Sequence, residues 1–323
     1  MNSIAKWLSC IVCAMGAALP VVAAEPNYPE RAISIVVPFT AGNANDAWAR
    51  TVATRLNERL KQPVVVENRP GAGGTIGAAH VARAKPDGYT LLVNSTTMST
   101  SQLTFKTPGY DIVKDFAPVG LLAYAPMGIF VNGSLPVNSL AEFIAYAKRN
   151  PGKINFGSSG SGSIMHLNAE RVNLETGMGA LHIPYSGGAP AVQALMANDI
   201  HFLVIDVASG LPGIQSGRLK LLAIGASTRL PALPNVPTTR EAGLSFDPSL
   251  WYGIFAPAGT PPEVLKVLRR EVNQIVTESP YRAALEARSS NLPPTTIEQF
   301  QSALVKEISN YREAIVKAKI KIE

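Results

Sequence analysis

Short apolar runs alternate with amphipathic stretches along the first part of the chain. The runs at residues 32–38, 63–67 and 89–94 are short and largely apolar, with β-branched residues prominent, and this favours strands. Residues 46–60 and 75–84 instead predict helices. Strands that alternate with helices are typical of a parallel sheet, so this part of the chain is predicted to be α/β.

The first of these helices has the clearest periodicity. Val52, Leu56 and Leu60 are four residues apart and therefore share one face of a helix. Asn45 or Asp46 stands where a polar side chain caps the first turn. The pattern therefore predicts a strand, a small-residue loop and a helix in direct succession.

A second set of the same units follows a long apolar run at residues 118–131. Ser139 to Glu142 has the spacing of a capping box and opens a helix that stops near residue 150. Residues 164–176 predict another helix, which ends at Gly177. Pro190 takes the place of a first helical residue, in a helix that leads to Asn198. The strands predicted in this set are residues 153–156, 182–185, 202–205 and 219–224.

The end of the chain holds a second apolar run, at residues 251–256, and two helices. Thr260 to Glu263 has the spacing of a second capping box and heads a helix that continues to about Glu278. The last helix is predicted from about residue 296 to residue 317. The two apolar runs flank the middle α/β set, so we interpret them as strands that cross between two lobes.

This interpretation gives a two-lobed α/β fold with the ligand cleft between the lobes. Lobe 1 is expected to contain residues 25–123 and 252–323, and lobe 2 residues 124–251. The 46% of hydrophobic residues is sufficient for two buried cores, and 16% of charged residues excludes a disordered chain.

The first 24 residues have the pattern of a secretory signal peptide. Lys6 precedes an apolar stretch that ends in small residues, and we expect cleavage after Ala24. Both cysteines, Cys10 and Cys13, lie in this segment, so the mature chain would hold no disulfide, thiolate metal site or cysteine nucleophile. A lipid anchor on Cys10 is disfavoured, because residues 7–9 do not match the box that precedes a lipidated cysteine.

Several motifs suggest nucleotide binding, catalysis or metal binding but lack residues that this chemistry needs. Residues 157–162 have the spacing of a phosphate loop but lack the lysine that follows one, and residues 71–77 miss the dinucleotide spacing. Ser161, His166 and Asp206 can be drawn as a catalytic triad, although a histidine so close to a helix start more often packs or caps. The four histidines show no zinc spacing, and the scattered Lys and Arg residues form no nucleic-acid stripe. We therefore expect no cofactor, no metal and no nucleic acid.

Three strand–loop–helix units have loops of small residues, at residues 40–46, 158–163 and 186–188. Small side chains leave the backbone N–H groups of a helix start accessible, and these groups attract anions. Any one loop could be a simple turn. Three loops that face one cleft predict a site for carboxylates.

Residues 38–46 with Arg50, residues 66–74 and residues 86–90 resemble the solute receptors of tripartite tricarboxylate transporters, the Bug proteins. The resemblance continues through residues 184–187, 233–238, 241–243 and 251–261 and covers essentially the whole mature chain. It implies a type II-like periplasmic binding protein fold, no catalysis, and a small carboxylate held by backbone amides, hydroxyls and waters. It also implies a periplasmic location and delivery of the ligand to membrane permease subunits.

One residue departs from the family pattern. Family members usually carry a second glycine directly after Gly42, whereas this chain has Asn43. A side-chain amide donates and accepts hydrogen bonds, so the ligand is expected to differ from citrate-like compounds. Phe39 and Trp48 could stack on an aromatic ligand. Asp46 is itself negative and is assigned to capping and to positioning a water.

The expected binding site draws on both lobes. The protein is expected to be a monomer and not an enzyme; a receptor for a membrane histidine kinase is the alternative function, and an exported hydrolase is a weaker one. The residues expected to bind the ligand are Phe39, Thr40, Ala41, Gly42, Asn43, Asp46, Ser95, Thr97, Ser158, Ser159, Ser161, Ser163, His166, Tyr185, Ser186, Gly187 and Asp206.

Overall fold

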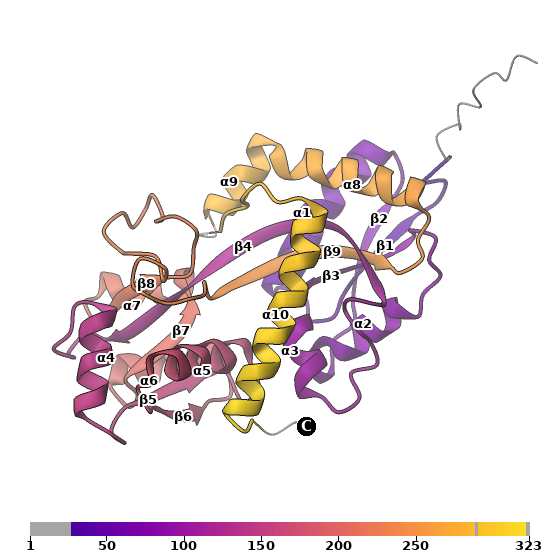
Figure 1. Cartoon of the computed structure of the whole chain (residues 1–323). Helices are drawn as coiled ribbons and strands as arrows, with labels where there is room; N and C mark the ends of the chain where they lie inside the picture. The colour runs from indigo at the N-terminus through magenta and orange to yellow at the C-terminus, as the bar shows by residue number, and fades with distance from the viewer. Residues whose placement is uncertain (1–26, 288–289, 321–323) are drawn as a thin grey trace, which may run out of the picture.

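A computed structural model describes residues 27–287 and 290–320. The signal peptide predicted over residues 1–24 lies outside the described residues, together with its cleavage site. None of the helices in the described ranges has the length and apolar character needed to cross a membrane. The described residues form two α/β lobes joined by two long strands (Figure 1).

Lobe 1 is built on the first three predicted strands. Strand β1 (Ile33–Val37) lies between β2 (Val64–Asn68) and β3 (Thr90–Ser95) and is parallel to both. Its core includes the fully buried side chains of Trp48 and Phe255. The helices of this lobe are α1 (Ala44–Leu60), α2 (Thr75–Ala82), α3 (Thr97–Thr104), α8 (Pro262–Thr277) and α9 (Ser279–Ala287).

Lobe 2 is built on the second α/β set and has a core of its own. Strand β5 (Asn155–Ser158) pairs in parallel with β6 (Leu181–Pro184) and β7 (Phe202–Asp206). The rings of Phe143, Phe156 and Phe202 are in contact at its centre, with centroids 5.2–5.4 Å apart. The other elements are β8 (Leu219–Ile224), α4 (Leu140–Arg149), α5 (Ile164–Thr176), α6 (Gly188–Ala197) and α7 (Val207–Gln215).

Strands β4 (Phe116–Asn132) and β9 (Ser249–Pro257) connect the lobes, where the sequence predicted two crossing strands. They are antiparallel along the whole of β9, from the Phe116–Pro257 pair to the Pro126–Ser249 pair. From Met127 onward β4 pairs with β7 and β8 instead. The strand order is β2-β1-β3-β9-β4-β7-β5-β6, and β8 pairs with β4. The lobe boundaries drawn from the sequence remain a proposal.

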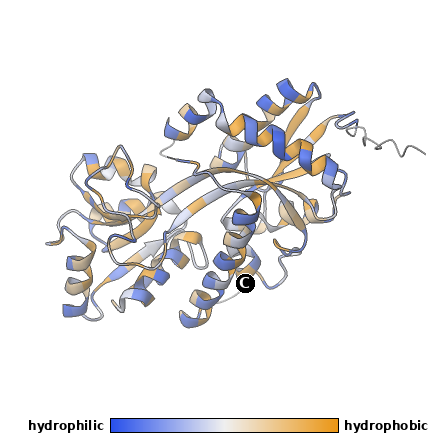
Figure 2. Ribbon diagram, turned by 45° about the horizontal axis from the view of Figure 1, so that its top comes forward, coloured by the Kyte–Doolittle hydropathy of each residue, from blue (hydrophilic) through white to orange (hydrophobic). Residues whose placement is uncertain are grey.

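The last helix, α10 (Ile297–Lys317), crosses both lobes (Figure 1). It contacts α3 of lobe 1 and α5 of lobe 2. The Trp251 indole on β9 donates its N–H to both Glu307 carboxylate oxygens, at 3.0 and 3.1 Å. Tyr311 and Ile315 pack against Leu167 of α5 in a small apolar cluster. Figure 2 shows that hydrophilic and hydrophobic residues alternate along the helices, and that hydrophobic residues are frequent in the strands that the helices surround.

Three details of the helix ends differ from the sequence expectation. Asn43, rather than Asn45 or Asp46, caps α1, because its side chain accepts from the Asp46 N–H. The Thr260 hydroxyl donates to the Pro257 carbonyl, so the second capping box is wrong. Pro190 is the third residue of α6 and not the first, because Gly187 caps that helix. The first two differences reflect local hydrogen bonds of Asn43 and Thr260 that spacing alone does not show.

Candidate functional site

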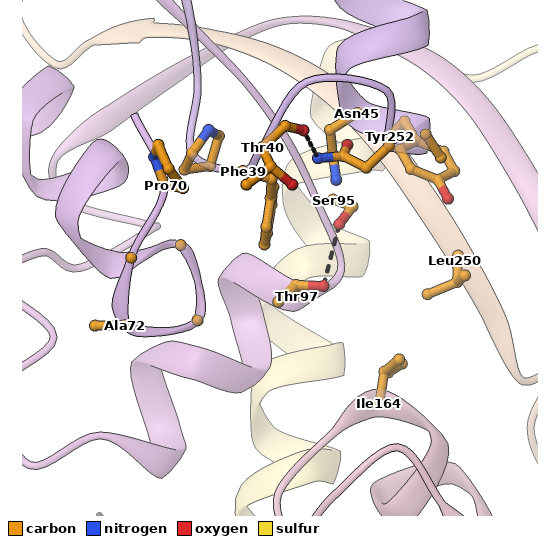
Figure 3. A pocket seen from close by; sticks show the side chains of 16 residues that line it. Phe39, Thr40, Asn45, Pro70, Ala72, Ser95, Thr97, Ile164, Leu250 and Tyr252 are labelled. Atoms are coloured by element: carbon orange, nitrogen blue, oxygen red, sulfur yellow. Dashed lines mark hydrogen bonds between the residues drawn. The ribbon is translucent and has the colours of Figure 1, made fainter. Parts of the chain in front are cut away.

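A cavity of about 470 Å³ opens where the lobes meet, mostly on the side of lobe 1 (Figure 3). Its wall is formed by the loop after β1, by residues 70–74, and by the junction of β3 with α3. Ile164 of lobe 2 and Leu250 and Tyr252 of β9 close it from the other side. None of the described residues that line it has a charged side chain.

A second cavity of about 440 Å³ continues from the first into lobe 2, and Ile164 and Leu250 line both. Its wall includes the first residues of α5 and α6, Ser209 of α7, and Met127, Met165 and Met196. Among the described residues that line it, Asp206 is the one with a charged side chain. The two hollows therefore adjoin and are together called the cleft, with neutral polar groups on the side of lobe 1 and Asp206 on the side of lobe 2.

The loop after β1 is held in shape by its own polar groups. The Asn43 amide donates to the Thr40 carbonyl at 2.6 Å, and its oxygen accepts from the Asp46 N–H at 3.1 Å. Gly42 has φ +87°, which a glycine adopts without strain. The amide of Asn43 is therefore already engaged within the loop, and contact with a ligand stays a prediction.

Asp46 lies beneath this loop, where its side chain is 5% exposed. One carboxylate oxygen accepts from the Gly42 N–H and from Arg50 Nε, both at 3.0 Å. The other accepts from the Asn68 amide at 3.0 Å. The hydrogen bond from Arg50 lowers the pKa of Asp46 to about 2, so this carboxylate is ionised at neutral pH. Asp46 ties the loop to α1 and β2, and it does not line either cavity.

Ser95 and Thr97 lie at the carboxyl end of β3, on the floor of the first cavity (Figure 3). The Ser95 hydroxyl donates to Thr97 Oγ1 at 3.2 Å. This bond uses an acceptor site of Thr97 and leaves its hydroxyl able to donate, and Thr97 lines the cavity. Parallel strands present such side chains at one edge of the sheet, where open α/β folds bind ligands.

Residues 70–74 form the wall that the sequence reasoning missed. Ala72, Gly73 and Gly74 have φ values of +44°, +59° and +91°, a conformation that favours glycine. A Cβ atom on Gly74 would lie 3.0 Å from the Phe39 ring, so this glycine lets the ring fit against the loop. In the sequence these glycines belong to a segment that misses the dinucleotide spacing. They also belong to residues 66–74, which resemble the receptor family.

The loop before α5 is organised around two stacked histidines. The rings of His166 and His182 are 3.6 Å apart and nearly parallel. His166 Nδ1 accepts from the Gly162 N–H at 3.0 Å, and His182 Nε2 lies 2.7 Å from the Ser158 hydroxyl. Burial, and secondarily the neighbouring His166, lowers the pKa of His182 to about 4, so His182 is neutral at pH 7.

The proposed triad is not assembled. His166 Nε2 faces Glu170 at 3.9 Å, and its Nδ1 is taken by Gly162, so both nitrogen atoms have partners other than Ser161 and Asp206. Asp206 caps α7 by accepting from the backbone N–H and the hydroxyl of Ser209, at 2.9 and 2.8 Å. The structure therefore gives His166 a packing role and Asp206 a capping role.

Of the residues expected to bind the ligand, seven line the cleft and ten do not. A ligand role for any of them stays a prediction. Those in the wall of the first cavity are Phe39, Thr40, Asn43, Ser95 and Thr97, and those in the second are Ser159 and Asp206. The others lie beside the cleft: Ala41, Gly42, Asp46, Ser158, Ser161, Ser163, His166, Tyr185, Ser186 and Gly187.

The reasoning from sequence also missed Asn45, which lines the first cavity from the first turn of α1. It assigned no binding role to Ile164, Leu250 or Tyr252, which come from α5 and β9. No signal in a single sequence links these positions to the loop after β1, because they meet only in the folded chain. In the described ranges, no three His, Cys, Asp or Glu side chains are grouped to hold a metal ion.

Comparison with known proteins identifies the chain. A family model described as "Tripartite tricarboxylate transporter family receptor" matches residues 48–320. Protein BugT of Bordetella pertussis is 34% identical over 314 residues, which covers 96% of each chain. A UPF0065 protein of Pseudomonas sp. strain P51 is 38% identical over 251 residues, 77% of this chain and 75% of its own.

Three solved structures share the fold. A ligand-free TctC solute-binding protein from Polaromonas has a TM-score of 0.81 and 34% identity over 90% of this chain and 99% of its own. Rpa4515 of R. palustris, solved with adipate, has a TM-score of 0.74 and 32% identity over 91% and 99%. MatC of Rhodopseudomonas palustris, solved with malate, has a TM-score of 0.71 and 32% identity over 89% and 100%. The chain has the two-lobed fold of periplasmic binding proteins and belongs to the tripartite tricarboxylate transporter receptor family.

Proposed function

We propose that the protein captures a small organic carboxylate in the periplasm and delivers it to the permease subunits of a tripartite tricarboxylate transporter. The observation that carries this proposal is the first cavity. Hydroxyl groups and helix starts form its wall, and none of the described residues that line it has a charged side chain. Neutral donors of this kind bind an anion without a counter-ion and release it readily.

The donors come from the first turns of two helices, α1 and α3. The N–H of Asp46 is used by the Asn43 side chain, and that of Ala47 by the Asn43 carbonyl. The N–H groups of Ala44 and Asn45 precede these in the first turn of α1, where no intrahelical acceptor is available. Together with the Thr97 hydroxyl they would hold one carboxylate group.

The relatives support this ligand class. Rpa4515 holds adipate and MatC holds malate, and each has 32% identity with this chain over nearly its whole length. Both ligands are dicarboxylates. The second cavity offers space for the rest of such a molecule, beside the starts of α5 and α6. Binding without turnover fits the family, whose described members are receptors.

The first prediction tests this function through Thr97. We expect titration calorimetry with succinate, malate, adipate, propionate and benzoate to show binding of at least one of them. Thr97→Val keeps the shape of the side chain but removes its hydroxyl, so it should weaken binding about tenfold or more, the effect of one hydrogen bond to a charged group.

Thr54→Val is the matched control, because Thr54 is exposed on the same lobe and its hydroxyl donates only to the Arg50 carbonyl. Its affinity should equal that of the unmodified protein. Absence of binding for every carboxylate tested would contradict the proposed function. Recovery of chemically altered ligand after long incubation would contradict a receptor role and favour a hydrolase.

A further inference from the structure

One hydroxyl group in the first cavity has no partner within the described residues. Tyr252 of β9 is 8% exposed and lines this cavity, and no hydrogen bond uses its hydroxyl group. The unpartnered side-chain atoms that are shut off from solvent in the described ranges are Asn45 Oδ1 and Ser99 Oγ, and the Tyr252 oxygen is not one of them. In Figure 3 the hydroxyl points toward Leu250, which lines both cavities. It is therefore open to a molecule that enters the cleft.

The other buried tyrosines of the described residues all use their hydroxyl groups. They are Tyr110, Tyr281 and Tyr311, which donate to the Met98 carbonyl at 2.7 Å, to the Leu122 carbonyl at 3.0 Å and to Asn168 Oδ1 at 3.5 Å. Buried polar groups in proteins are nearly always paired in this way. Tyr252 is the exception, and it is the buried tyrosine that lines a cavity.

The packing of Tyr252 does not require the hydroxyl group. Its ring contacts Trp48, with centroids 6.4 Å apart, and its backbone is held between β3 and β4. A phenylalanine would fill the same volume and make the same contacts. The hydroxyl is therefore the part of this side chain that is available to a ligand.

The hydroxyl group remains a donor at any pH in the physiological range. Burial, and secondarily the negative charge of Asp206, raises the pKa of Tyr252 to about 12, so the oxygen keeps its proton. Asp206 lines the second cavity, and its effect on Tyr252 places this hydroxyl group where the two cavities adjoin. Both carboxylate oxygens of Asp206 accept from Ser209, and neither accepts from Tyr252.

A carboxylate is the acceptor that suits this donor best. A hydrogen bond from a hydroxyl to a carboxylate is charge-assisted and about twice as strong as one to a neutral acceptor. The described lining of the first cavity contains no carboxylate of its own, and the first turns of α1 and α3 offer more neutral donors on the opposite side. The charge of Asp206 repels an anion in the second cavity and so favours a position on the lobe 1 side of Tyr252.

We propose that the Tyr252 hydroxyl donates a hydrogen bond to a carboxylate group of the ligand in the first cavity. This inference rests on the proposed function, because it adds a binding residue to the same cavity from β9, opposite the loop after β1. A ligand that displaces water from the cavity has to replace the hydrogen bond that water makes to this hydroxyl. A carboxylate does so with a stronger bond.

The test separates binding from stability. Tyr252→Phe removes a hydroxyl that has no partner in the protein, so its urea unfolding midpoint without ligand should equal that of the unmodified protein. Titration calorimetry should use the tightest-binding of succinate, malate, adipate, propionate and benzoate. The variant should bind this carboxylate at least tenfold more weakly, because a hydrogen bond to a charged group is lost.

Tyr281→Phe is the matched control. The ring of Tyr281 also contacts Trp48, with centroids 5.6 Å apart, but its hydroxyl donates to the Leu122 carbonyl and not to the cavity. The opposite pattern is expected. Its urea midpoint should fall because the Leu122 carbonyl loses its donor, and its affinity for the carboxylate should be unchanged.

The outcomes separate the two proposals. An affinity of Tyr252→Phe equal to that of the unmodified protein, or a loss of stability as large as that of Tyr281→Phe, would overturn the role of Tyr252 and leave the receptor function standing. Failure of all five carboxylates to bind the unmodified protein would overturn the receptor function, and the assignment of Tyr252 with it.

Discussion

Asparagines 43, 45 and 68 lie around one loop and have different surroundings. Asn43 and Asn68 are bound to the loop and to Asp46, whereas Asn45 has no partner for its oxygen. Asn43 could be singled out in the sequence, because it replaces a glycine of the family pattern. The unpaired oxygen of Asn45 could not, because it becomes apparent only when every other hydrogen bond of the loop is assigned.

Asp46 gives a prediction about pH. Its pKa is about 2 in the folded protein against an ordinary value of 3.8, and Arg50 is the main cause. The ionised Asp46 carboxylate therefore stabilises the folded protein fully above about pH 4, and this stabilisation is lost as the pH falls toward 2. Asp46→Asn should lower the free energy of unfolding by about 1 kcal/mol at pH 7, since Arg50 is half exposed and solvent weakens the pair.

Urea denaturation at pH 7 and at pH 2.5 measures this effect. The difference between Asp46→Asn and the unmodified protein should shrink at the lower pH. Glu313→Gln is the control, because Glu313 pairs with Lys317 on an exposed face of α10 and should change stability little. An equal difference at both pH values would show that the variant acts through packing and not through charge.

At the scale of elements, periodicity and end signals predicted the regular helices well. Helix α5 spans residues 164–176 and ends at a left-handed Gly177, as the sequence indicated. Helices α3, α7 and α9 were not predicted. Helix α7 contains Gly210, Pro212 and Gly213, which disfavour an isolated helix, and it forms because the Asp206 cap and the contacts with β7 and β8 hold it.

The site was less predictable than the elements. Loops of small residues located the starts of α1, α5 and α6, but three of the contributing walls come from residues 70–74, from Ile164 and from β9. These meet only after the lobes and crossing strands are in place. Spacing within one segment carries no information about such contacts, so the sequence located the loops at the cleft better than the other residues of its wall.

The histidine stack joins β6 to the start of α5 and gives a second prediction about pH. Burial lowers the pKa of His182 from 6.5 to about 4, so the unfolded chain binds a proton more readily than the folded one between these values. Stability is then fully present above pH 6.5 and decreases as the pH falls to 4. His182→Gln retains a donor for the Ser158 hydroxyl and cannot titrate, so its unfolding free energy should depend less on pH in this window.

Thermal or urea unfolding at intervals from pH 4 to pH 7 measures the slope. His80→Gln changes a histidine on α2 of lobe 1, away from the stack, and serves as the matched variant. It should keep the pH dependence of the unmodified protein. Identical slopes for His182→Gln and the unmodified protein would show that His182 does not link protonation to folding.

For the whole molecule, three elements pass between the lobes. Strands β4 and β9 pair along the middle of the protein, and β4 exchanges β9 for β7 and β8 between Pro126 and Met127. Helix α10 is the third element, bound to β9 through Glu307 and to α5 through Tyr311 and Ile315. A rotation of the lobes would therefore bend β4 and β9 near these residues and slide α5 along α10.

The cleft between the lobes leads to a prediction about closure. Ile164 of lobe 2 and Thr97 of lobe 1 line the same cavity, so a ligand that touches both sides favours the closed arrangement only through contacts that the open one lacks. We therefore expect small-angle scattering to give a smaller radius of gyration with a bound carboxylate than without it.

The scattering experiment needs a ligand whose binding is confirmed by calorimetry, and a non-binding solute at the same concentration as its control. Gly187→Val adds a side chain beside the cleft without disturbing the fold, since its nearest obstacle is Pro190 Cδ at 3.7 Å and its backbone is extended. Because Gly187 directly precedes Gly188, which lines the second cavity, the added side chain should obstruct a ligand at the start of α6, so this variant should bind more weakly and contract less. An unchanged scattering curve for the unmodified protein at saturating ligand would mean that β4, β9 and α10 hold the lobes in one arrangement, and that selectivity is set by a rigid cleft.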